Sequence, residues 1–346
     1  IAGFSAGVPK NIVYNDNDSV KSNDYDASAF VETTGVKERR FNPELTTSDL
    51  CIAASEQLII DLNWDKSEIE AIIFVSQTTD YFLPATACIL QDRLGLSKEC
   101  YTSDIVLGCS GWVYGLSSIA SLMSNGSIKK ALLMAGDAKR HFPSNDPLFG
   151  FAGTVTALEY CENVSKMQFH FGTDGSGFDA IIIPDGGSRN QVSSSSFEIE
   201  EIDGKQYNRL QTRMKGMDVF GFGISIAPKS IKKLATYFNF DYLNFDYYVF
   251  HQANLKMNEI IKKKLKLVDE EVPISMHKFG NTSSASIPIT IISELRGKVE
   301  NKLTKFICCG FGVGLSWGTV AFETSSIIIS ELVEVGDNHL NSKYVV

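Results

Sequence analysis

The stretch DIVLGCSGWVYGLSSIA, residues 104–120, predicts a strand that runs directly into a helix. Its first residues are apolar and β-branched, as in a strand buried within a sheet, and the helix is expected over residues 111–123. Gly108 and Gly111 give the backbone room for a sharp turn. Cys109 lies in that turn, where the positive end of the helix dipole and free backbone N–H groups favour a thiolate. The turn therefore suits a nucleophilic cysteine, although a buried structural cysteine beside a tight turn has the same pattern.

Outward from this turn, short apolar runs alternate with helical patterns. We expect strands at residues 71–75, 104–107, 130–135, 180–183, 247–250 and 305–309. Helices are expected at residues 48–62, 84–94, 111–123, 218–237, 254–265 and 284–295. Because the strand runs are apolar throughout rather than alternating, they predict strands that are covered on both faces. The sequence therefore indicates a layered α/β fold.

The chain divides into two halves that weakly echo each other. A strand, a small-residue turn and a helix are expected in residues 103–123 and again in residues 276–295. We place the boundary near residue 170, which gives an N-terminal half of residues 1–170 and a C-terminal half of residues 171–346. A C-terminal extension is expected after about residue 323, and the serine-rich segment 188–196 is expected to be an exposed loop.

Composition excludes several classes of protein. The 346 residues are 44% hydrophobic and 21% charged, which is ordinary for a globular protein. A net charge of −9 weighs against nucleic-acid binding. No apolar run approaches the roughly 18 residues of a membrane-spanning helix. The seven cysteines show neither a disulfide framework nor metal-ligand spacing, so we expect a reducing, cytoplasmic compartment and no metal site.

Two further candidates for chemistry lie in the second half. His251 follows the predicted strand in YYVFHQANLKM, and Asn281 follows Gly280 in HKFGNTSSASIPI. A histidine in such a place can be an ordinary core residue, and the asparagine can be a helix cap. Together with Cys109 they supply a thiol, an imidazole and an amide at turns able to face one cleft. Cysteine nucleophiles are typically found with such partners, close in space rather than in sequence.

The motifs resemble β-ketoacyl-acyl-carrier-protein synthase III, a family of thiolase-fold condensing enzymes. They are TTGVKERR, LPATACILQDRLGL, GCSGWVYGL, TDGSGFDAIIIP, HQANLK, GNTSSASIP and GFGVGLSWG, in the order of the family and at its approximate spacing. The resemblance covers nearly the whole chain, and HQAN followed by GNTSSASIP is its most specific part. It implies a five-layered αβαβα fold made of two similar halves, and a homodimer.

The resemblance also implies the chemistry. Cys109 would be acylated by an acyl thioester, and its backbone N–H, with that of Val313, would form an oxyanion site. His251 and Asn281 would stabilise the enolate formed when a malonyl-type thioester loses carbon dioxide. Attack of this carbanion on the acyl-enzyme gives a β-ketoacyl thioester. No cofactor is implied, because the coenzyme A or phosphopantetheine thioesters are substrates.

Several contacts are carried over by resemblance, each with a simpler interpretation beside it. Phe311 would support the side of the cleft that holds His251, or be a core aromatic residue. Asn254 would contact the pantetheine arm, or cap the following helix. Leu83 would line the acyl tunnel across the dimer, or pack in a core or interface.

A basic helix face suggests a carrier protein as partner. The predicted helix from residue 254 carries Lys256, Lys262, Lys263, Lys264 and Lys266. Acyl carrier proteins are acidic, so Lys256 and Lys263 are candidate docking residues. A solvated helix face is the alternative.

The chain also departs from the family pattern. Standard members carry Trp and Arg that hold the coenzyme A adenine where this chain has Ala29 and Thr33, and FGFAGTVTA replaces a usual FGDGAGA segment. Lys256 and Val313 replace a usual Arg and Gly. These changes suggest a different acyl donor, such as a carrier-bound acyl group. Two alternatives therefore stay open: an acyltransferase acting on a hydroxyl or amine, and a non-catalytic dimer partner in a synthase complex.

Overall fold

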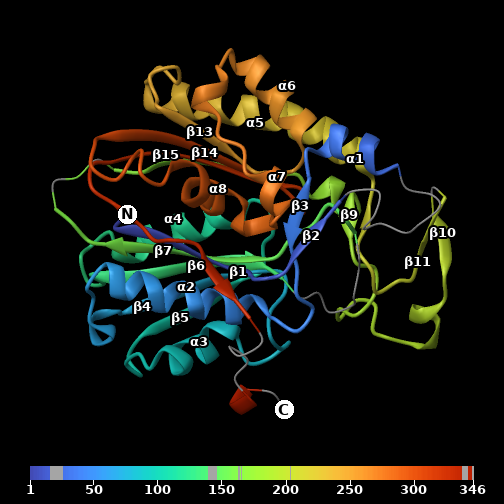
Figure 1. Cartoon of the computed structure of the whole chain (residues 1–346), viewed down its shortest axis with the longest axis horizontal. Coiled ribbons are helices and arrows are strands. Elements are labelled where there is room, and N and C mark those ends of the chain that lie inside the picture. The colour runs from blue at the N-terminus through green and yellow to red at the C-terminus, as the bar shows by residue number, and fades with distance from the viewer. Residues whose placement is uncertain are drawn as a thin grey trace.

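Five layers of secondary structure make up the protein in the computed structural model, which describes residues 1–15, 26–138, 146–162, 164, 166–202, 204–336 and 342–344. Two β-sheets alternate with three layers of helices (Figure 1). This is the layered α/β arrangement that the alternating sequence pattern predicts.

The larger sheet belongs mainly to the N-terminal half. Its strands run in the order β16-β1-β7-β6-β4-β5, and β17 also pairs with β1. They are β1 (Gly3–Pro9), β4 (Ala71–Val75), β5 (Tyr101–Ile105), β6 (Lys130–Asp137), β7 (Ala152–Glu159), β16 (Ile328–Ile329) and β17 (Val333–Val335). Strand β4 is parallel to both β5 and β6, so the carboxyl ends of these three strands lie at one edge of the sheet.

The smaller sheet belongs to the C-terminal half and has the order β13-β14-β15-β8. Its strands are β8 (Gln168–Thr173), β13 (Tyr247–Phe250), β14 (Thr304–Gly312) and β15 (Ser316–Thr324). The expected boundary near residue 170 falls inside β8, where His170 pairs with Thr319 of β15. The extension after residue 323 returns to the larger sheet, where β16 and β17 pair in parallel with β1.

Three pairs of longer helices fill the layers around these sheets (Figure 1). Helices α2 (Thr47–Asp61) and α3 (Thr86–Leu94) cover the outer face of the larger sheet, and α5 (Gly216–Phe238) and α6 (Leu255–Leu265) cover the outer face of the smaller one. Helices α4 (Gly111–Met123) and α8 (Ser286–Leu295) lie between the sheets. Their apolar side chains form one core with the inner faces of both sheets, which fixes the two halves against each other.

The remaining elements are short. Helices α1 (Ala27–Thr34) and α7 (Met276–Phe279) are short, and three two-stranded ribbons pair β2 with β3, β9 with β12 and β10 with β11. Their strands are β2 (Ile12–Tyr14), β3 (Glu38–Arg40), β9 (Ile181–Ile182), β10 (Glu200–Ile202), β11 (Lys205–Tyr207) and β12 (Arg213–Met214).

The prediction of a fully buried strand at residues 180–183 is wrong. Strand β9 has two half-buried residues and pairs only with β12, and Ile183 is exposed. Pro184 follows directly and has no N–H to donate to a ladder, so β9 stays short and pairs only in a two-stranded ribbon. The segment 188–196 is mostly exposed and outside any sheet, as predicted.

In the part of the chain that the structure describes, no helix combines the length and apolar character needed to cross a membrane. All seven cysteines are free thiols.

Candidate active site

The turn that carries Cys109 has the predicted form. Strand β5 ends at Ile105 and α4 begins at Gly111, so Cys109 lies just before the first turn of the helix. Its side chain is partly exposed. Because α4 belongs to the middle layer, this turn faces the end of the smaller sheet as well as its own.

The end of β14 lies directly against Cys109. A Cβ on Gly312 would be 2.7 Å from the Cys109 Cβ and 2.9 Å from its Sγ, so only glycine permits this approach. The backbone N–H of the next residue, Val313, donates to the Cys109 sulfur, as does the N–H of Cys109 itself. The two N–H groups that the resemblance assigned to an oxyanion site therefore both point at the nucleophile, one from each half of the chain.

Burial sets the protonation state of this thiol. It raises the pKa of Cys109 to about 11, and the nearby Asp137 carboxylate raises it further, whereas hydrogen bonds from Ser283 and the two backbone N–H groups lower it. The sequence led us to expect a stabilised thiolate from the helix terminus. Burial outweighs that effect, because the anion loses more solvation than these donors replace.

Ser283 is a site residue that the sequence analysis missed. Its hydroxyl donates to the Cys109 sulfur, and its backbone has a φ of +51°, a left-handed conformation that is costly for a serine. The Oδ1 of Asn281 holds this conformation by accepting the Ser283 N–H at 2.9 Å. In the sequence, Ser283 is one of several small polar residues in NTSSAS, and nothing in that composition distinguishes it.

His251 continues from β13 into the centre of the molecule. Its N–H donates to the Cys309 carbonyl at 2.9 Å, and its side chain is 2% exposed. Burial lowers the pKa of the imidazole to about 3, so the ring is neutral near pH 7. Its Nδ1 lies 2.7 Å from the Ser286 Oγ. When that hydroxyl donates to Nδ1, the ring proton resides on Nε2, which becomes a hydrogen-bond donor.

The side chain of Asn281 is likewise held so that it can donate a hydrogen bond. Its N–H donates to the Leu148 carbonyl at 2.8 Å, and its carbonyl accepts from the Gly150 N–H at 3.2 Å, so its backbone is pinned on both sides. Because its Oδ1 accepts from Ser283, its Nδ2 group is left as a donor. The preceding Gly280 has a φ of +63°, and a Cβ there would lie 2.7 Å from the Leu148 carbonyl oxygen.

Two short segments join these groups into one site. Residues 280–288 supply Asn281, Ser283 and the partner of His251, and residues 310–314 supply the glycine and N–H that meet Cys109. Phe311 in the second segment packs edge-on against His251, with ring centroids 5.7 Å apart and an interplanar angle of 86°. The predicted thiol, imidazole and amide are therefore linked through shared neighbours, and Phe311 lies on the His251 side as expected.

Other predicted residues lie apart from this cluster. Asn254 caps α6, with its Oδ1 accepting the Met257 N–H at 2.8 Å, which is the simpler of its two interpretations. Leu83 is 81% exposed in the loop between β4 and α3. Lys256 and Lys263 are exposed on α6, in the outer layer. The described residues contain no group of three or more His, Cys, Asp or Glu side chains arranged to hold a metal ion.

A cysteine held by backbone donors from two sheets, with neutral imidazole and amide donors beside it, defines the class of thiolase-fold condensing enzymes. Comparison with known proteins agrees. The N- and C-terminal family models of 3-oxoacyl-[acyl-carrier-protein] synthase III match residues 103–175 and 239–324. The chain belongs to the 3-oxoacyl-[acyl-carrier-protein] synthase III family, and it is an acyltransferase-type condensing enzyme.

Individual relatives extend the match to nearly the whole chain. The putative 3-oxoacyl-[acyl-carrier-protein] synthase 3 of Campylobacter jejuni is 32% identical over 96% of this chain and 96% of that protein. The β-ketoacyl-[acyl-carrier-protein] synthase III of Clostridioides difficile is 34% identical over 82% of this chain and 86% of its own length. The crystal structure of a 3-oxoacyl-(acyl-carrier protein) synthase from Burkholderia xenovorans superposes with a TM-score of 0.89, at 36% identity, over 97% of this chain and 96% of that one. The predicted family and thiolase fold are confirmed.

Proposed function

We propose that the enzyme loads an acyl group from an acyl thioester onto Cys109 and then condenses it with a malonyl-type thioester to form a β-ketoacyl thioester. The observation that carries this proposal is the convergence of the Cys109 and Val313 N–H groups on the Cys109 sulfur. These donors stabilise the thiolate before loading. After loading, they are placed to hold the thioester oxygen of the acyl-enzyme as it becomes tetrahedral.

In the loading step, the Cys109 sulfur attacks the thioester carbonyl, and the departing pantetheine thiolate takes up a proton. Because burial raises the pKa of the Cys109 thiol to about 11, the thiolate is a minor species at neutral pH. The hydroxyl of Ser283 and the two N–H groups reduce this cost, because they stabilise the thiolate.

In the condensation step, the malonyl group loses carbon dioxide and leaves an enolate. Its oxygen is held by Nε2–H of His251 and Nδ2–H of Asn281, which are neutral donors in a buried site. The enolate carbon attacks the acyl-enzyme carbonyl, a carbon–carbon bond forms, and the Cys109 thiolate leaves. The enzyme returns to its starting state, and the product is one two-carbon unit longer.

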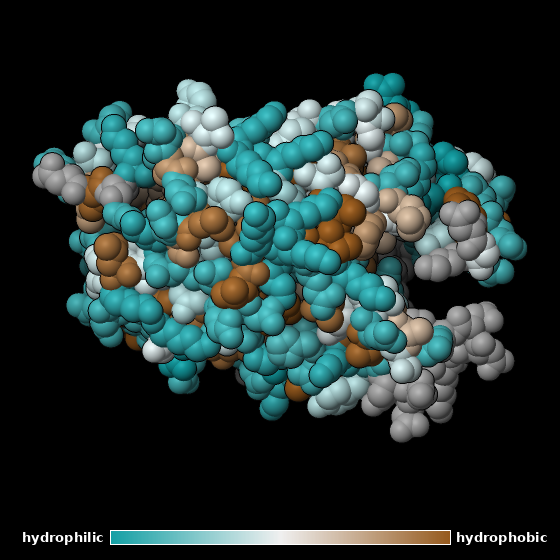
Figure 2. Space-filling model, turned by 90° about the horizontal axis from the view of Figure 1, so that it is seen from above, coloured by the Kyte–Doolittle hydropathy of each residue, from teal (hydrophilic) through white to brown (hydrophobic). Residues whose placement is uncertain are grey.

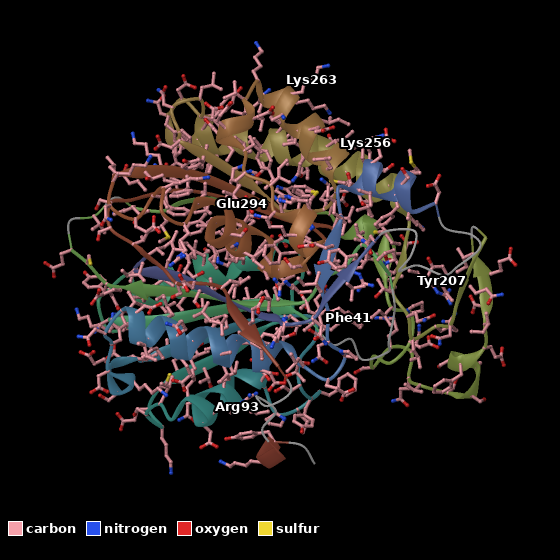
Figure 3. The ribbon with its side chains drawn as sticks, viewed as in Figure 1. Phe41, Arg93, Tyr207, Lys256, Lys263 and Glu294 are labelled. Carbon is pink, nitrogen blue, oxygen red and sulfur yellow. The ribbon has the colours of Figure 1, made fainter. Side chains whose placement is uncertain are left out.

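An acidic carrier protein is the proposed bearer of the malonyl group, and of the acyl donor as well. Lys256 and Lys263 project from α6, which begins four residues after His251 (Figure 3). Neither has an ion-pair partner among the described residues. The face seen from above, over α5 and α6, is mostly hydrophilic with separate apolar spots (Figure 2). Exposed cations on an otherwise acidic protein favour an acidic partner at this face.

The enzyme is proposed to act as a homodimer. Strand β5 is the open edge of the larger sheet, and an open edge can pair with a second chain. Phe82 and Leu83 beside it are 85% and 81% exposed, which is unusual for two adjacent large apolar side chains. A second copy would cover both features. We also propose a reducing, cytoplasmic location, which the seven free cysteines support.

Intact-mass analysis tests this proposal. The enzyme is incubated with a panel of acyl thioesters, and Cys109→Ala is the matched variant. We expect a mass gain equal to the acyl group, absent from Cys109→Ala, and then release of carbon dioxide and a β-ketoacyl product when a malonyl-carrier is added. Acylation without carbon dioxide release from any malonyl-type thioester would favour an acyltransferase acting on a hydroxyl or amine. No acylation by any donor would favour a non-catalytic partner in a synthase complex.

A further inference from the structure

The polar residue Gln77 lies at the same sheet edge as the nucleophile. It follows β4 by two residues, and β4 is parallel to β5 with Val75 opposite Ile105, so Gln77 and Cys109 leave the sheet at the same edge. Its backbone N–H donates to the Asp137 carboxylate at 2.7 Å. That carboxylate also accepts from the Ser76 hydroxyl at 3.1 Å, which fixes the start of the β4–α3 loop.

The side chain of Gln77 reaches the residue before the nucleophile. A Cβ on Gly108 would lie 2.4 Å from the Gln77 Oε1 and 3.2 Å from the Ser283 Oγ. The Gln77 carboxamide and the Ser283 hydroxyl therefore flank the same point, and that hydroxyl also bonds the Cys109 sulfur. The Gln77 side chain is nevertheless exposed, and its carboxamide has no hydrogen-bond partner among the described residues.

The smaller sheet contacts the Cys109 sulfur through Gly312 and the Val313 N–H. The exposed Gln77 carboxamide lies beside the Ser283 hydroxyl that bonds this sulfur, so it is available to an acyl group carried on Cys109.

We propose that Gln77 is a specificity-determining residue that hydrogen-bonds an oxygen on the acyl chain carried by Cys109. The enzyme then prefers short acyl thioesters with a hydroxyl group near the thioester, such as 3-hydroxyacyl groups, over plain hydrocarbon chains of the same length. This inference rests on the proposed function, because it requires acyl loading on Cys109.

The physical reason is the cost of an unsatisfied amide. A hydrocarbon chain packed against the carboxamide would remove its water without replacing the hydrogen bonds. A hydroxyl restores them, because it can both donate to Oε1 and accept from Nε2. A site built to hydrogen-bond a substrate group rejects analogues that lack it more strongly than an apolar pocket discriminates by size. We expect a preference of about tenfold or more.

A competition experiment tests the inference on the full-length enzyme. Equal amounts of 3-hydroxybutyryl- and butyryl-coenzyme A compete for Cys109, and intact mass reports which group is loaded. Wild type is expected to load the hydroxylated group about tenfold faster. Gln77→Met, which keeps the length of the side chain but not its polarity, is expected to lose the preference. The control Gln57→Met, on the outer helix α2, is expected to keep it.

A second variant separates a loss of donor preference from a general loss of activity caused by a less stable protein. Gln77→Glu keeps the acceptor oxygen, so it is expected to retain the preference as a ratio of two rates even if both rates fall. Equal loading of the two donors by wild type, or an unchanged preference in Gln77→Met, overturns the inference and leaves the proposed function standing. Failure of wild type to load any donor in the wider panel removes the proposed function itself.

Discussion

Helices α4 and α8 both lie in the middle layer, and both follow turns of small residues, yet the two turns present different groups. At the α4 turn, the Cys109 N–H points at the Cys109 sulfur, and the Val313 N–H joins it from the end of β14. At the α8 turn, Ser283 donates to that same sulfur and its N–H occupies the Asn281 Oδ1, which leaves the side-chain Nδ2 as a donor.

The surroundings of the two turns explain the difference. Strand β5 leads into the α4 turn, so Cys109 lies at the end of a complete ladder. The prediction of a strand before the α8 turn is wrong, because the described residues Met276–Phe279 form the short helix α7 instead. The α8 turn is attached by a single bridge between Phe149 and Asn281, and a short 3-10 turn at Ser283–Ala285 separates Asn281 from the helix. The α4 turn thus carries the nucleophile, whereas the α8 turn supplies Ser283 to that nucleophile and, in the proposed function, the Asn281 amide to the substrate.

The largest expected effect separates the two turns directly. His251→Ala removes an enolate donor but leaves the Cys109 turn and the contact between Asn281 and Ser283 intact, so acyl loading is expected to remain near the wild-type rate. Condensation is expected to fall by about 10²- to 10³-fold, the usual cost of removing one oxyanion donor. Single-turnover loading by intact mass and steady-state carbon dioxide release measure the two steps. An equal loss in both steps would contradict the division of roles.

A change at Ser286 is expected to affect condensation but not acyl loading. Ser286→Ala removes the partner of His251 Nδ1 and frees the ring to place its proton on either nitrogen. We expect about a tenfold lower kcat for condensation with little change in KM or in loading. The conservative Ser286→Thr keeps a hydroxyl and should restore most of the rate. Nitrogen chemical shifts of His251 should show the Nε2–H form in wild type and a mixture in the alanine variant.

Buried His251 should also give the protein a pH-dependent stability. Its pKa is lowered from 6.5 to about 3. Below pH 6.5, this imidazole is therefore protonated in the unfolded chain but stays neutral in the folded chain. This contribution to the free energy of unfolding is complete above pH 6.5 and is lost as the pH falls toward 3, by about 1.4 kcal/mol for each pH unit. Urea unfolding at pH 7.5 and 5.5 should show a steeper loss for wild type than for His251→Gln. Equal losses would mean that His251 is not buried as described.

A smaller effect is expected from Asp137 on the nucleophile turn. Its carboxylate raises the pKa of the Cys109 thiol, so Asp137→Asn should lower that pKa and increase the thiolate fraction at any pH below it. Alkylation of Cys109 by iodoacetamide at pH 8 is expected to become several-fold faster, followed by peptide mass spectrometry to exclude the exposed Cys88 and Cys161. Asp61→Asn, at the exposed end of the outer helix α2, serves as the control. A slower reaction in Asp137→Asn would show that its hydrogen bonds matter more than its charge.

The smallest expected effect concerns α6, the outer helix that follows His251. Lys256→Glu and Lys263→Glu should raise KM for carrier-bound substrates a few-fold at low salt, with less difference at high salt, because the interaction is between exposed charges. Coenzyme A substrates should be unaffected. The control variant is Lys98→Glu. Lys98 follows α3 in the opposite outer layer, so this change should leave KM for carrier-bound substrates unaltered. Unchanged carrier kinetics at low salt would rule out docking at α6.

The sequence predicted best the elements whose pattern is local. The helix at residues 111–123 and the strands at residues 71–75 and 247–250 have the predicted bounds, because each is a continuous apolar or periodic run between clear breaks. Strand β7 was not predicted, since AGTVTALE is made largely of small residues whose strand form depends on β1 and β6 beside it.

For the site as well, the sequence predicted the local features but not those that depend on distant segments. The positions of Cys109, His251 and Asn281 follow from local motifs, and the structure links them. The role of Ser283 and the raised pKa of Cys109 do not follow from local motifs, because both arise where segments more than 150 residues apart meet. The C-terminal strands were expected only as an extension for a similar reason: their pairing with β1 is invisible to any local pattern.

That pairing has a consequence for biosynthesis. Strand β1 begins at Gly3, whereas its neighbours on one side begin at Ile328 and Val333 and leave the ribosome more than 300 residues later. The larger sheet therefore cannot complete this edge until those residues have been made, and one side of β1 stays unpaired until then. A chain stopped at Thr324 would contain every group of the site and still leave that edge open to pairing with other chains.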